Sequence, residues 1–207
     1  GVDGRDPRPS SLGRVGAVTN MLGTIGRACI SREFTVLATG KTSPVASWLR
    51  ALAAEEHARC GGPGVGAVGM CFTGGFALAM ATDERMLAPV LSQPSLPFAA
   101  LPGRRSTIDI SDADLEKVQV RCAKGLQVMG LRFEGDVLAP GSRFRFLEEK
   151  LGDAFIGIEL PDSTANPDSE FPKPHSVLTE DLIDAPGEPT YEALQQVLEF
   201  FHSKLEL

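Results

Sequence analysis

The stretch VGAVGMCFTGGFALAM, residues 65–80, decides how this chain is interpreted. A short apolar run, Val65–Met70, predicts a buried strand, and the residues Phe72–Thr82 predict a helix. Between the two lies Cys71, with glycines close to it on both sides. A tight bend of small residues between a strand and a helix is how some enzymes expose a nucleophile. Cys71 is therefore a candidate nucleophile, although a buried structural cysteine explains the bend alone equally well.

The rest of the chain predicts strands and helices in alternation. Further strands are expected over residues 88–92, 126–133 and 155–160, and further helices over 112–123, 141–151 and 191–204. A helix starting at Pro44 and stopped by Gly61 is expected before the bend, with Val45, Trp48, Leu49 and Leu52 on its apolar face. Alternating strands and helices favour an α/β fold with a mostly parallel sheet and helices on both faces. A length of 207 residues suits one domain, 1–207, in which residues 1–15 are expected to be loop.

Charge and composition exclude several function classes. The net charge of −7 makes nucleic acid and anionic membranes poor partners. No apolar stretch approaches the length of a membrane span, so the cytoplasm is the default expectation. The 4 cysteines and 3 histidines are scattered without the spacing of a metal site, and we expect no metal.

The glycines before the cysteine allow a second interpretation. Residues 64–69, GVGAVG, match the dinucleotide-binding pattern G-x-G-x-x-G, and Glu84 lies at about the right distance for a ribose contact. That pattern needs a strand before its first glycine and a helix at its third. Here the expected strand lies inside the pattern, so a dinucleotide site is the weaker alternative. In the nucleophile-elbow interpretation Gly69 is in place, but Thr73 stands where the general pattern has glycine.

A nucleophilic thiol needs a base and a carboxylate to orient that base. His175 lies in a loop after the fourth expected strand, whereas His57 and His202 lie in expected helices. Asp136 directly follows the third expected strand. Asp153 precedes a strand, at the wrong end, and the adjacent Glu134 should point the other way. In the α/β-hydrolase fold the order along the chain is nucleophile, acid, histidine, which these residues obey.

Three segments resemble the dienelactone hydrolase family. They are VGAVGMCFTGGFALAMA (65–81), GLRFEGDVLAPGSRF (130–144) and FPKPHSVLTED (171–181). The resemblance implies a three-layer α/β-hydrolase fold with a triad of Cys71, Asp136 and His175. It also implies carboxylesterase-type hydrolysis of a small ester or lactone through a thioester, with no cofactor. The backbone N–H of Phe72 would supply half of the oxyanion hole.

Two departures from the family qualify this expectation. An arginine expected four residues after the catalytic histidine is replaced by Thr179, and Arg32 is a candidate substrate-binding residue. The strands that normally precede the elbow strand are not evident, apart from a weak candidate at Phe34–Ala38. The chain therefore resembles a family member that is truncated at its N-terminus. The alternative function is a non-catalytic, hydrolase-like protein whose exposed sheet edge associates with another chain, for example as a homodimer.

Overall fold

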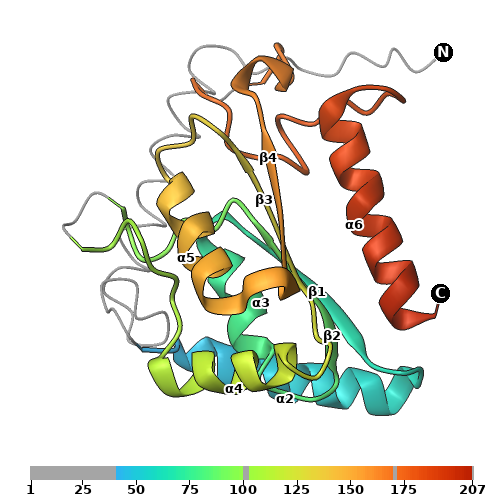
Figure 1. Cartoon of the computed structure of the whole chain (residues 1–207). Helices are drawn as coiled ribbons and strands as arrows, with labels where there is room; N and C mark the ends of the chain where they lie inside the picture. Colours follow the sequence, from blue (N-terminus) through green and yellow to red (C-terminus); the bar gives the residue numbers. More distant parts are fainter. Residues whose placement is uncertain (1–40, 100–102, 170–171, 207) are drawn as a thin grey trace, which may run out of the picture.

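The computed structural model describes residues 41–99, 103–169 and 172–206 (Figure 1). The strands are β1 (Val65–Met70), β2 (Met86–Ser92), β3 (Val128–Phe133) and β4 (Phe155–Leu160). The helices are α2 (Pro44–Cys60), α3 (Gly74–Met80), α4 (Asp112–Cys122), α5 (Gly141–Leu151) and α6 (Pro189–Leu205). Short 3₁₀ turns are η1 (Cys71–Thr73), η2 (Gly152–Ala154) and η3 (Asp162–Thr164).

All strand pairs of the described sheet are parallel, in the order β1-β2-β3-β4. The strand order follows the chain order, so every connection crosses from the carboxyl end of one strand to the amino end of the next. The carboxyl ends of all the strands therefore meet at one rim of the sheet. The prediction of an α/β fold with a parallel sheet is confirmed.

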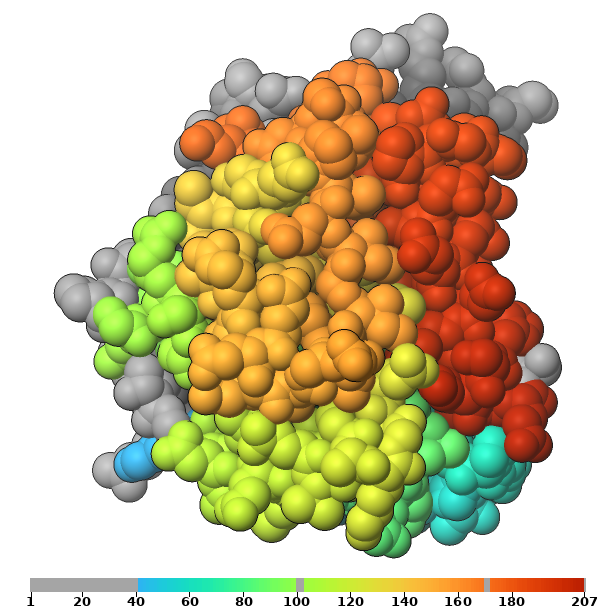
Figure 2. Space-filling view, viewed as in Figure 1, coloured from blue at the N-terminus to red at the C-terminus, as the bar shows by residue number. Residues whose placement is uncertain are grey.

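Helices cover both faces of this sheet. One apolar cluster joins α3, α4 and α5 to the first face, with Leu78, Leu91 and Phe144 among its buried members. A second cluster joins α6 to the opposite face, through Val197 and Phe200 (Figure 1). Side chains fill the space between the ribbons of α4, α5 and α6, as the space-filling view shows (Figure 2).

Local signals set most element boundaries. The Ser111 side chain accepts a hydrogen bond from the backbone N–H of Asp114 at 3.2 Å, which caps the N-terminus of α4. Gly61, at φ 75°, ends α2, and Pro44 occupies its first turn. The observed bounds of β1, β4 and α5 are the predicted ones.

The predicted apolar face of α2 is confirmed at Leu49 and wrong at Trp48 and Leu52. Trp48 is 63% exposed and Leu52 is 41% exposed, whereas the fully buried residue of this helix is Ala46. Leu49 and Ala53 pack against the core beside it. Small alanines let the helix approach α3 closely, and this turns the larger side chains outward.

The expected loop at residues 1–15, the weak strand at Phe34–Ala38 and Arg32 lie outside the described residues. The described part of the chain contains no helix that is long and apolar enough to cross a membrane.

Candidate active site

Cys71 lies at a sharp bend directly after β1. Its φ angle is 51°, in the left-handed region that residues other than glycine seldom adopt. The bend works only with small neighbours: a Cβ at position 69 would lie 2.3 Å from the carbonyl oxygen of Thr73. A Cβ at position 74 would lie 2.5 Å from the Cα of Pro94. The glycines around the cysteine are therefore required by close backbone approaches.

Thr73, which departs from the general elbow pattern, takes part in the bend. Its hydroxyl donates to the carbonyl of Met70 at 2.9 Å and accepts from the backbone N–H of the same residue at 3.1 Å. One side chain thus satisfies both backbone groups of the last residue of β1, where the strand ladder ends. The turn η1 then leads into α3, so the bend joins a strand to a helix.

His175 and Asp136 lie together at the same rim of the sheet. The Nδ1 atom of His175 is 2.7 Å from Oδ2 of Asp136. The two residues are 7% and 5% exposed, so their contact is shielded from water. The other carboxylate oxygen of Asp136 accepts from the backbone N–H groups of Leu138 (2.9 Å) and Ala139 (3.2 Å). These bonds hold the carboxylate in one orientation toward the imidazole.

Cys71 and His175 lie close enough for each to shift the pKa of the other. Burial disfavours the thiolate, but the hydrogen bond and charge of His175, with smaller contributions from Ser95 and the Phe72 backbone, lower the pKa of Cys71 below 9.0. Burial also disfavours the imidazolium, but hydrogen bonds and charges of Asp136 and Cys71 raise the pKa of His175 to about 10. Both shifts favour the thiolate–imidazolium pair over the neutral thiol and imidazole.

The structure thus brings together the three residues that the sequence predicts, and it separates their rivals. His57 contacts the carbonyl of Gly62 at 3.0 Å, at the end of α2. His202 lies in α6, and Asp153 lies in η2, before β4 rather than after it. Thr179, in the arginine position, is exposed and its backbone N–H bonds to Ser176. The predicted Arg32 contact lies outside the described residues.

Asp181 is a residue of this site that sequence reasoning missed. Its buried carboxylate accepts hydrogen bonds from the backbone N–H groups of His175 (2.8 Å) and Ser176 (2.7 Å). A second carboxylate therefore holds the histidine loop by its backbone, while Asp136 holds the ring. Residues 175–181 lie in a loop, to which no helical or strand period applies, so no sequence pattern could have identified it.

Arg143 is the second such residue. Its fully buried guanidinium donates to the carbonyls of Pro94, Pro97 and Leu138. The first two carbonyls belong to the loop after β2, and the third belongs to the loop that carries Asp136. The side chain of Arg143 therefore ties two of the loops at this rim to α5.

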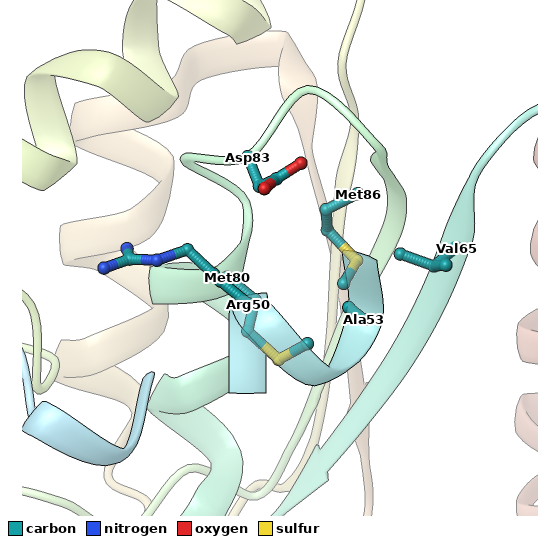
Figure 3. Close-up of a pocket in the computed structure, with 6 residues that line it drawn as sticks. All are labelled: Arg50, Ala53, Val65, Met80, Asp83 and Met86. Atoms are coloured by element: carbon teal, nitrogen blue, oxygen red, sulfur yellow. The ribbon is translucent and has the colours of Figure 1, made fainter. Parts of the chain in front are cut away.

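The glycine pattern of residues 64–69 does not form a dinucleotide site. Residues 65–69 lie within β1, and the strand-to-helix turn comes only at Cys71. A shallow depression with no room for a water molecule lies at the opposite end of the sheet (Figure 3). It is lined by residues that include Val65 and Met86, at the amino ends of β1 and β2, so it is remote from Cys71.

Comparison of the chain with family models, with curated proteins and with solved structures found no match to any of them.

Proposed function

We propose that this protein is a hydrolase of small esters or lactones in which Cys71 is the nucleophile. One observation carries the proposal: a cysteine in a strained conformation, at a strand-to-helix bend, is coupled electrostatically to an imidazole that a buried carboxylate orients. Backbone strain and a lowered thiol pKa together are typical of functional sites rather than of structural cysteines.

The acylation step uses the Cys71 thiolate and the His175 imidazolium together. The Cys71 thiolate attacks the ester carbonyl carbon, and a C–S bond forms as the carbonyl oxygen takes up negative charge. The Phe72 backbone N–H, which already lies in hydrogen-bonding contact with the sulfur, is placed to donate to this oxygen. The carbon–oxygen bond then breaks, and the His175 imidazolium gives its proton to the leaving oxygen.

Deacylation uses the same groups in reverse. Neutral His175 takes a proton from water while the water oxygen attacks the thioester carbonyl. The C–S bond breaks, the acid product leaves, and the thiolate–imidazolium pair is restored. Asp136 keeps the Nδ1 proton on its side of the ring, which leaves Nε2 for the proton transfers.

The resemblance to the dienelactone hydrolase family supports the α/β-hydrolase assignment and the substrate class. Thr179 is uncharged and stands where the family is expected to have an arginine. This favours substrates that carry no carboxylate at that point. In this fold the second oxyanion donor comes from a loop before the elbow strand. Before β1 the structure describes residues 41–64, whose one regular element is α2, and no loop of this kind lies among them.

The deciding experiment compares p-nitrophenyl acetate hydrolysis by the wild type and by Cys71→Ala. We expect release of p-nitrophenol by the wild type only, and a mass increase of one acetyl group on the Cys71 peptide after a rapid acid quench. Cys60→Ala is the matched control, because Cys60 is an exposed cysteine at the end of α2 and should leave the rate unchanged. Equal rates in wild type and Cys71→Ala would reject the proposal.

A second candidate function rests on the sheet edge. Among the described residues β1 pairs only with β2, and Val68 and Met70 on β1 are exposed. An unpaired strand with apolar side chains can add a strand from another chain. A dimer in light scattering that Val68→Lys converts to monomer, together with an inert Cys71, would favour this function over hydrolysis.

A further inference from the structure

Ser95, in the loop after β2, lies against the nucleophile. Its backbone N–H donates to the carbonyl of Cys71 at 2.9 Å, and its hydroxyl is one of the groups that lower the pKa of the Cys71 thiol. Ser95 is 4% exposed, so water does not compete for its hydroxyl. The hydroxyl also donates to the carbonyl of Gln93 at 3.0 Å.

A serine hydroxyl has one proton to donate and two lone pairs that accept. While Cys71 is a neutral thiol, the hydroxyl donates to the Gln93 carbonyl, and the sulfur needs no donor. A thiolate can only accept hydrogen bonds, and hydrogen bonds to charged groups are stronger than those to neutral carbonyls. Rotation of the hydroxyl about its C–O bond would then turn the proton from the Gln93 carbonyl toward the sulfur.

We propose that Ser95 is a further catalytic residue, whose hydroxyl donates to the Cys71 sulfur whenever that sulfur is negatively charged. This inference deepens the proposed function and rests on it. Before acylation the hydroxyl shares with His175 the stabilisation of the thiolate that attacks the carbonyl carbon. During deacylation the thiolate is the leaving group as the C–S bond breaks, so the same hydroxyl assists both half-reactions.

The test measures the thiolate directly and needs no substrate. Variants are made in a Cys29→Ser/Cys60→Ser background, and the rate of iodoacetamide alkylation of Cys71 is followed against pH by peptide mass spectrometry. Ser95→Ala is expected to move the midpoint of the alkylation profile to higher pH and to lower the rate at pH 7 by about tenfold. Ser95→Thr, which keeps the hydroxyl, is expected to recover most of this loss.

Ser92→Ala is the matched control. Ser92 is a buried serine at the end of β2 whose hydroxyl bonds the side chain of Gln93, so its loss removes a similar buried hydrogen bond. Its alkylation midpoint should stay at the parent value. If Ser95→Ala does not fold, as judged by circular dichroism, Ser95→Cys replaces it, because a thiol is nearly isosteric but a weak donor. The thiol introduced by Ser95→Cys lies on a different tryptic peptide from Cys71, so the two alkylation products are distinguished by mass.

A folded Ser95→Ala or Ser95→Cys with the parent midpoint would overturn the inference. That result would leave the proposed function intact if Cys71→Ala still abolishes hydrolysis. Conversely, equal hydrolysis by wild type and Cys71→Ala would reject the hydrolase and with it a catalytic role for Ser95, even if the midpoint shifts.

Discussion

One carboxylate oxygen of Asp181 accepts hydrogen bonds from the backbone N–H of His175 at 2.8 Å and from the next N–H along the chain at 2.7 Å. This oxygen binds the backbone rather than the imidazole. It therefore sets the position of the histidine backbone, while Asp136 sets how the ring is turned. Two carboxylates from different loops thus divide the positioning of one base.

Asp181→Ala should impair hydrolysis. Asp136 and Cys71, the side chains that raise the pKa of His175, stay in place in this variant. Without the two backbone bonds the loop can shift, and a displacement of about 1 Å costs on the order of 10² in rate. We expect kcat to fall by about that factor with little change in KM. Asp184→Ala, an exposed aspartate in the same loop, is the control. Wild-type kinetics from folded Asp181→Ala would contradict the positioning role.

Asp136→Asn should cause a larger loss. The amide cannot stabilise the imidazolium and can favour the wrong tautomer, and a comparable change in a serine hydrolase lowers kcat by about 10⁴. The pKa of His175, raised to about 10 in part by Asp136, should fall toward its ordinary value, as measured by NMR of the ring protons. Asp153→Asn, exposed and at the other end of the sheet, should behave as wild type.

The pH profile of hydrolysis should be bell-shaped. The rate should rise as pH increases through the lowered pKa of Cys71, below 9.0, because only the thiolate attacks. It should fall as pH passes about 10, because His175 then loses the proton that the leaving oxygen needs. Alkylation of Cys71 needs only the thiolate, so it should show the lower limb and not the upper one.

The two profiles together test the ion pair. His175→Gln removes the charge and should move the alkylation midpoint of Cys71 to higher pH. A wild-type midpoint near that of an ordinary thiol, unchanged by His175→Gln, would mean that the two side chains are not coupled in solution.

Gly69→Ala should damage the bend itself. The added methyl would lie 2.3 Å from the carbonyl oxygen of Thr73, which is backbone and cannot rotate away. We expect a loss of stability of about 1–3 kcal/mol, measured by denaturant unfolding, and reduced alkylation of Cys71. Gly141→Ala is the control, since its added methyl would lie 3.3 Å from the end of the Arg132 side chain, which can adjust. Equal stability of both variants would show that the bend tolerates a Cβ.

The sequence predicted most of what depends on local pattern. Apolar runs with flanking glycines located β1 and β4, and Ser111 with Asp114 located the start of α4. The order of Cys71, Asp136 and His175 along the chain, each after a strand, predicted their meeting, because parallel strands bring their carboxyl ends to one rim. The predicted face of α2 was confirmed at Leu49 and wrong at Trp48 and Leu52, because alanines of this helix pack against the core in their place.

What the sequence determined by itself was therefore the alternation of elements and the rim at which the reactive side chains gather. Only the tertiary structure decided how those side chains are held: Asp181 on the backbone of His175, Arg143 across two loops, and Ser95 on the carbonyl of Cys71. These contacts join residues within loops or between different elements, where no period of helix or strand applies. Most of their partners are backbone groups, which every residue carries, so the chain must fold before any pattern distinguishes them.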